Sequence, residues 1–163
     1  MKAPVLYNIR SPLQVIASGN PVEKSSTLSQ SWGGLGKLSG YKFEQNIPIP
    51  SYLVAIASGD LKSASIGPRS TVWAGPEEVD ACKWELDGDM EKFMEAAEGI
   101  VFKYAWGTYN VLILPSSFPY GGMENPIYTF ATPTIISGDS KPVIKTSVAP
   151  IDNHRTKYRC YCP

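Results

Sequence analysis

Histidine and net charge are what this sequence has least of. Its 163 residues contain one histidine, His154, and 15 basic side chains stand against 15 acidic ones, for a formal net charge of +0. The balance of charge argues against a strongly basic nucleic-acid binder. Apolar stretches such as residues 111–114 fall far short of the ~20 residues that span a bilayer. We therefore expect neither a nucleic acid nor a membrane as a partner.

Cysteine is also scarce. Cys82, Cys160 and Cys162 are an odd set with no paired framework, which favours reduced thiols over disulfides. The first ten residues contain no apolar run long enough for a signal peptide. These features predict a cytoplasmic protein.

Hydrophobic residues, at 43%, suffice for a sizeable core, and 14 glycines with 14 prolines favour strands, turns and long loops over a helical bundle. Short β-prone runs predict strands, and the segments between them, including the polar stretch 23–30, the glycine-rich stretch 33–40 and residues 115–126, carry no strand pattern. The predicted strands are residues 3–9, 13–17, 41–49, 52–57, 70–74, 109–114 and 127–136.

Two helices are predicted in the middle of the chain, at residues 76–86 and 90–101, separated by Asp87-Gly88-Asp89. The second has an apolar stripe at helical spacing, which we interpret as core packing. The stripe consists of Met90, Phe93, Met94, Ala97, Ile100 and Val101.

The last 23 residues differ from the rest. Residues 141–163 hold five basic side chains and one acidic one, a net of +4, and show no hydrophobic period. His154, Cys160 and Cys162 lie there; three possible ligands on an aperiodic segment are weak grounds for a metal site.

The segment Gly121-Gly122-Met123-Glu124-Asn125 is the candidate functional motif. Two adjacent glycines let another backbone approach closely, and the strand-prone residues 127–130 that follow offer an edge for an extended peptide. Glu124 beside that edge could accept a hydrogen bond from a peptide α-ammonium group, worth about 1.5–3 kcal/mol. The plainer alternative, which spacing alone favours, is a Gly-Gly turn with an exposed glutamate.

The same five residues match the G-x-M-E-N exopeptidase motif. On this motif the sequence resembles the zinc aminopeptidases of the gluzincin family, and most of all the leukotriene A(4) hydrolase branch. The resemblance covers about residues 2–140, and its further stretches are residues 43–53, 66–73, 106–110 and 132–139.

The resemblance implies an α+β fold in three parts. Residues 1–61 would be the C-terminal part of a β-sandwich-like N-terminal domain, residues 62–140 the start of a thermolysin-like catalytic domain, and residues 141–163 an unrelated or disordered tail. It also implies a substrate strand in which Glu124 anchors the amino terminus of a peptide, the glycines let the peptide lie close, and Asn125 shapes the turn behind Glu124. The implied substrate-binding residues are Tyr120, Gly121, Gly122, Met123, Glu124 and Asn125.

The family's chemistry depends on zinc held by H-E-x-x-H and a later glutamate. A chain with one histidine cannot contain a motif with two. We therefore predict no catalytic residues and no bound zinc in this chain, and no peptidase turnover by it alone. It would then be an interior piece of an aminopeptidase; the alternatives are a non-catalytic module that binds peptide amino termini and a gene-model fragment without function. Such a piece would have open strand edges at residues 109–114 and 127–136 and would associate or be poorly soluble.

Overall fold

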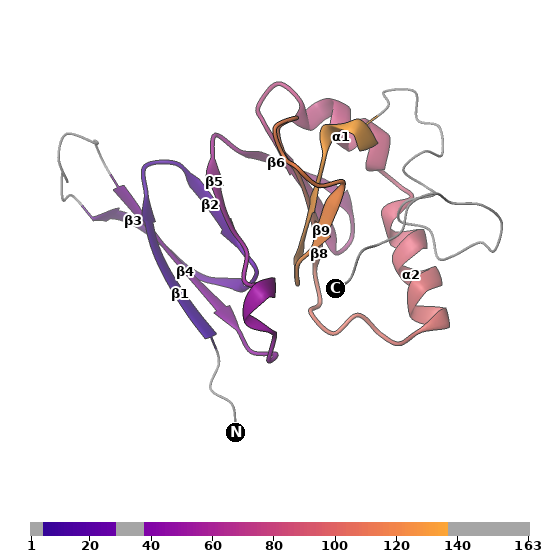
Figure 1. Cartoon of the computed structure of the whole chain (residues 1–163), viewed down its shortest axis with the longest axis horizontal. Helices are drawn as coiled ribbons and strands as arrows, with labels where there is room; N and C mark the ends of the chain where they lie inside the picture. Colours follow the sequence, from indigo (N-terminus) through magenta and orange to yellow (C-terminus); the bar gives the residue numbers. More distant parts are fainter. Residues whose placement is uncertain (1–4, 29–37, 137–163) are drawn as a thin grey trace.

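The α+β architecture is confirmed. A computed structural model describes residues 5–28 and 38–136, which form an all-β N-terminal part and a C-terminal part with a five-stranded sheet and two α-helices (Figure 1). Among the helices of these residues, none has the length and apolarity that crossing a bilayer requires.

The N-terminal part contains a three-stranded and a two-stranded sheet, both antiparallel. The three-stranded sheet has the order β1 (Val5–Ser11), β4 (Leu38–Gln45), β3 (Asn20–Leu28), and the smaller one pairs β2 (Gln14–Ala17) with β5 (Ile56–Gly59). Gln45 and Ser18 lie buried between them: the Gln45 amide donates to the Ser18 carbonyl at 2.9 Å, and the Ser18 hydroxyl accepts from the Ala55 amide at 2.9 Å. Both buried polar side chains are thereby satisfied.

The C-terminal sheet carries the candidate motif. Its order is β6 (Lys62–Gly67), β7 (Ser70–Ala74), β8 (Tyr109–Ile113), β10 (Tyr128–Ala131), β9 (Gly122–Glu124). The three inner strands run parallel, and the two outer strands are antiparallel to their neighbours. A parallel core of this kind is buried on both faces, which explains the nearly continuous apolar run of β8.

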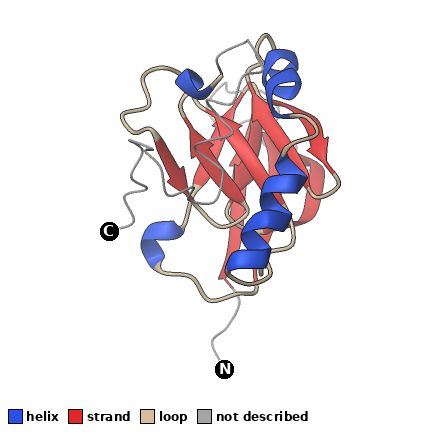
Figure 2. Cartoon of the chain, turned by 90° about the vertical axis from the view of Figure 1, so that its right-hand side faces the viewer, coloured by secondary structure: helices blue, strands red, loops and turns tan. Residues whose placement is uncertain are grey.

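Two helices, α1 (Val79–Leu86) and α2 (Met90–Ile100), connect β7 to β8 and cover one face of the sheet (Figure 2). Gly88, with a φ of 77°, makes the turn between them. Alternate strand residues face the helices, and the remaining ones face the N-terminal part. The cluster under the helices contains Ile66, Val72, Val111, Ile113, Val79, Cys82, Leu86 and Met90. The cluster on the other face includes Ile16 of β2 together with Leu112, Ile127 and Tyr128.

Several predicted boundaries were wrong. Strand β3 occupies much of the polar stretch 23–30, Gly40 lies inside β4, and β6 was not predicted. These strands depend on main-chain pairing with β4 and β7 more than on an apolar pattern, so periodicity does not reveal them. Residues 52–57 divide into a 3-10 turn, Ser51–Leu53, and the start of β5, because Pro48 and Pro50 interrupt pairing.

The end of the described chain also differs from expectation. The predicted loop 115–126 contains β9, and the predicted strand 127–136 stops at Ala131 and is followed by a 3-10 turn, Pro133–Ile135. Pro133 lacks the N–H that a longer ladder would need.

The stripe of the second helix is only partly core. Met90 and Met94 are buried, and Phe93 and Ala97 are half-buried, but Ile100 and Val101 are 69% and 67% exposed. The core cluster under the helices takes only Met90 from α2, so packing holds the start of the helix and not its last turn.

The predicted open edges were wrong as well. β8 lies between β7 and β10, and β10 lies between β8 and β9, so both strands are interior. Gly33, Gly34, Gly36, His154, Cys160, Cys162 and the predicted tail 141–163 lie outside the described residues. The domain boundary at residues 61 and 62 stays a prediction.

Candidate functional site

Strand β9, and not the segment after it, is the edge of the sheet nearest the motif. It pairs antiparallel with β10 in the register Glu124 with Thr129, Met123 with Phe130 and Gly122 with Ala131. No other strand of residues 5–28 or 38–136 pairs with β9. The expectation that residues 127–130 form the edge was therefore wrong, because β10 already has a strand on both sides. The outward main-chain groups of β9 are the ones available to an added strand.

Glu124 ends this edge strand as an exposed side chain. Ion pairs within the described residues join Arg69 to Glu91 and Glu98, and Lys92 to Asp89; none involves Glu124. The register places Glu124 on the same face of β9 as Gly122, and one carboxylate oxygen lies 3.7 Å from where a Gly122 Cβ would be. A cation reaching that face from solvent would find a carboxylate that no Lys or Arg of the described residues pairs with.

The two glycines differ in what surrounds them. A Cβ on Gly122 would lie 3.3 Å from the Phe130 carbonyl oxygen, tighter than ordinary van der Waals contact, whereas a Cβ on Gly121 would meet no atom of residues 5–28 or 38–136 within 4 Å. Gly122 therefore lets β9 pair closely with β10, and Gly121 leaves open space above the backbone. The prediction treated both glycines as room for a peptide; within the described residues, the space above Gly122 is partly taken by the Phe130 carbonyl and the Glu124 carboxylate, and the space above Gly121 is open.

Asn125 lies directly behind Glu124 and is buried. Its main-chain N–H and its side-chain amide both donate to the Met123 carbonyl, at 3.1 and 3.4 Å. These bonds close the chain into the turn between β9 and β10. Its geometry suits the turn-shaping role that the resemblance implies.

Tyr120 and Met123 complete the predicted set. Tyr120 is 67% exposed, and its ring meets the ring of Phe118 edge-on at a centroid distance of 5.7 Å. Met123 is half-buried on the face of β9 opposite Glu124. The structure thus brings Gly122, Met123 and Glu124 into one strand, with Tyr120 and Gly121 leading into it.

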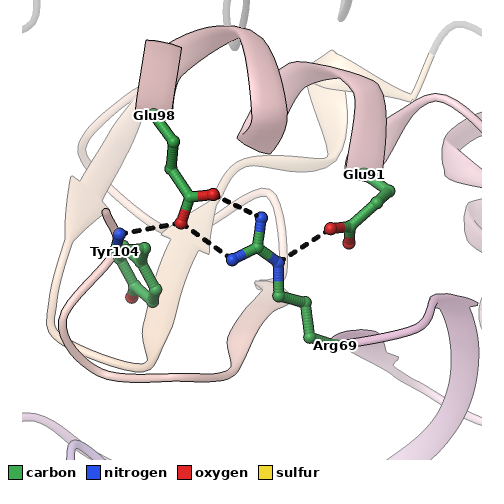
Figure 3. A network of polar contacts seen from close by, with 4 residues as sticks. All are labelled: Arg69, Glu91, Glu98 and Tyr104. Carbon is green, nitrogen blue, oxygen red and sulfur yellow. Dashed lines mark hydrogen bonds and ion pairs between the residues drawn. The ribbon is translucent and has the colours of Figure 1, made fainter. Parts of the chain in front are cut away.

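A polar network between the β6–β7 turn and α2 was not predicted from the sequence. The guanidinium of Arg69, at the β6–β7 turn, donates to both oxygens of Glu98 at 2.8 and 2.9 Å and to Glu91 at 2.9 Å (Figure 3). Hydrogen bonds from Arg69 and from the Tyr104 amide hold the pKa of Glu98 down at about 2, and the same carboxylates raise the pKa of Arg69. Twenty-nine residues separate Arg69 from Glu98, so no local spacing reveals the pair.

Two tyrosines connect this network to the motif. The Tyr109 and Thr129 hydroxyls lie 3.0 Å apart, and Thr129 is the cross-strand partner of Glu124. The Tyr104 hydroxyl accepts a hydrogen bond from the Ile127 amide at 3.3 Å, and burial raises the pKa of Tyr104 to about 12, so this phenol stays protonated near neutral pH.

Zinc ligands are not assembled in the described residues, which contain no group of three or more His, Cys, Asp or Glu side chains that could hold a metal ion. Cys82 lies buried in the apolar cluster under the helices, and this burial raises the pKa of its thiol to about 11. A protonated, apolar-packed thiol is a poor zinc ligand. These residues do not fit the family's metal.

Comparison with known proteins identifies relatives over most of the chain. It is 62% identical over 139 residues to leucine aminopeptidase 2 of Pyricularia oryzae, and 58% identical over 143 residues to leucine aminopeptidase 2 of Coccidioides immitis. These alignments cover 85% and 88% of this chain and 22% of each relative. Yeast LTA4 hydrolase solved in complex with bestatin superposes with a TM-score of 0.77 at 46% identity, over 89% of this chain and 21% of that one.

The chain is homologous to the leukotriene A4 hydrolase-like zinc aminopeptidases. The resemblance read from the sequence is thereby confirmed. No family model matches the chain. The chain spans about a fifth of the length of the curated relatives it matches.

Proposed function

We propose that this chain is the part of a leukotriene A4 hydrolase-like aminopeptidase that recognises the free amino terminus of a peptide substrate. The observation that carries the proposal is the position of Glu124: an exposed carboxylate without an ion-pair partner among the described residues, on the outermost strand of the sheet, beside open space above Gly121. The relatives are named leucine aminopeptidase 2, which supports aminopeptidase chemistry as the reaction class.

An extended peptide would lie alongside β9 and exchange main-chain hydrogen bonds with its outward groups. Glu124 would then accept hydrogen bonds from the α-ammonium group at the end of the peptide. A charge-assisted bond of this kind is worth about 1.5–3 kcal/mol, which corresponds to a preference of about 10- to 150-fold for a free over an acetylated amino terminus. That preference would make the segment select the first peptide bond of a substrate.

We do not assign the hydrolysis step to these 163 residues. The 163 residues contain one histidine, whereas the family's zinc motif needs two, and the described residues do not group metal ligands. We infer that zinc and the activated water come from sequence other than these 163 residues. On its own, this polypeptide would bind peptides without hydrolysing them, which is the alternative function of a non-catalytic peptide-binding module.

The test is a comparison of two peptides by isothermal titration calorimetry: Leu-Gly-Gly and its N-acetylated form. Glu124→Gln keeps the side-chain shape and removes the charge, so we expect it to abolish the preference for the free amine. Glu95→Gln, which removes another exposed carboxylate, on α2, is the matched control and should leave the preference intact. Equal affinity of the wild-type chain for both peptides would remove the proposal.

A further inference from the structure

Ile127 has a backbone conformation that its side chain disfavours. Its φ is 72°, and it is the one non-glycine residue with positive φ in the described ranges. A β-branched residue in the left-handed region is strained, and such strain persists only where the surroundings impose it. Ile127 lies in the connection from β9 to β10, three residues after Glu124, and its side chain is 1% exposed.

Both main-chain polar groups of Ile127 are held from outside the hairpin. Its N–H donates to the Tyr104 hydroxyl at 3.3 Å, and its carbonyl accepts from the Asn110 amide of β8 at 2.8 Å. Its side chain packs with Leu112 and Tyr128 in the cluster facing the N-terminal part. Asn110, Leu112 and Tyr128 belong to the inner strands of the sheet, whereas Tyr104 lies in the loop between α2 and β8 and makes the hydrogen bond to the Ile127 N–H.

Tyr104 is itself fixed at two ends. Its amide donates to Glu98 at 2.8 Å, and Glu98 is locked by the paired hydrogen bonds of Arg69 (Figure 3). Its ring meets the ring of Tyr109 edge-on at 5.7 Å and that of Trp106 at 5.5 Å. Tyr104, in the loop that follows α2, is thus anchored to the helix, and its hydroxyl contacts the turn that follows β9 (Gly122–Glu124), which we call the recognition strand.

We propose that Tyr104 is the positioning residue of the recognition strand: its hydroxyl holds Ile127 in the left-handed conformation and so fixes where β9 presents Glu124. The inference rests on the proposed function for the role of Glu124. If Ile127 relaxed to negative φ, the chain direction between Asn125 and β10 would change, and Glu124 would lose its register with Thr129. Tyr104 would not touch the substrate.

The test is Tyr104→Phe in the full chain, which removes the hydroxyl and keeps the ring contacts. Its matched control is Tyr41→Phe, which deletes the hydroxyl of a buried tyrosine in the N-terminal part; that hydroxyl also bonds the main chain, donating to the Leu13 carbonyl at 3.0 Å. Two quantities are measured: the ratio of affinities for free and acetylated Leu-Gly-Gly, and amide hydrogen exchange at Gly122–Glu124. A purely structural contribution lowers the melting temperature without changing the ratio.

We expect the affinity ratio, about tenfold or more in the wild type, to fall at least threefold in Tyr104→Phe, with faster exchange in β9. Tyr41→Phe should change neither. An unchanged ratio in Tyr104→Phe overturns the inference. If the wild-type ratio is already one, the proposed function fails, and exchange decides alone: faster exchange in β9 supports the positioning role, and unchanged exchange overturns it.

Discussion

Arg69 and Glu98 are joined by two parallel hydrogen bonds, from Nη1 to Oε1 at 2.8 Å and from Nη2 to Oε2 at 2.9 Å. This planar, bidentate geometry is the arrangement in which a guanidinium binds a carboxylate most strongly. It ties α2 to the β6–β7 turn, and through the Tyr104 amide it ties the loop after α2 to the same point. One ion pair therefore links the helical layer to the segment behind the recognition strand.

The pair predicts a loss of stability in acid. The pKa of Glu98 is about 2 in the folded chain against an ordinary value of 4.5, so the unfolded chain binds the proton more readily. The stabilisation is complete above pH 4.5 and is lost as the pH falls toward 2. We expect the difference in melting temperature between the wild type and Glu98→Gln to shrink over that interval. A difference that is constant from pH 6 to pH 3 would contradict this.

The two motif glycines predict opposite effects on stability. Gly122→Ala places a methyl group 3.3 Å from the Phe130 carbonyl, and we expect it to destabilise the fold by about 1 kcal/mol net. Gly121→Ala meets open space at ordinary φ, so it should stabilise by about 0.4–1 kcal/mol through the unfolded state. Urea denaturation measures both.

For Gly121→Ala we expect peptide affinity and stability to change in opposite directions. If a peptide backbone lies over Gly121, Gly121→Ala loses affinity for Leu-Gly-Gly although its stability is not reduced. Undiminished affinity in a stable Gly121→Ala variant would show that the peptide does not approach there, which would leave Glu124 as a surface acid without a bound backbone beside it.

The sequence predicted elements with a strong local pattern. β7 was predicted with its observed bounds, both helices were found, and Val79, Cys82 and Leu86 of α1 are buried as their spacing requires. The motif residues were found only because they match a known pattern; their spacing alone favoured a plain turn.

Non-local features could not be predicted. The edge strand is β9 and not the segment after it, because β10 pairs with β8 on its other side. β8 and β10 are not adjacent in sequence, so local patterns do not reveal this pairing. The left-handed conformation of Ile127 is equally hidden, since an isoleucine after Asn125-Pro126 signals a strand and not a positive φ. Tertiary packing overrides local preference at both places.

Exposed apolar side chains at the end of α2 lead us to predict self-association. Ile100, Val101 and Phe102 are consecutive and 69%, 67% and 73% exposed, a concentration of apolar surface that water disfavours. We expect Phe102→Glu to reduce concentration-dependent association in sedimentation velocity without lowering the melting temperature. Tyr52→Glu, at an aromatic side chain 63% exposed in the N-terminal part, is the control and should have little effect. A monomeric wild type at all concentrations would contradict the prediction.

Zinc should neither bind tightly to the 163-residue polypeptide nor make it a peptidase. A ligand that binds only the folded state raises its melting temperature. Because residues 5–28 and 38–136 assemble no metal site, we expect the same melting temperature with zinc as with chelator. Hydrolysis of leucine p-nitroanilide should stay at the level of buffer, because water without a metal ion is a weak nucleophile at neutral pH. Glu124→Gln serves as the internal comparison, since a contaminating aminopeptidase would hydrolyse the substrate equally in both preparations. Chelator-sensitive hydrolysis that Glu124→Gln abolishes would place the catalytic centre within these residues and overturn the assignment of zinc to sequence elsewhere.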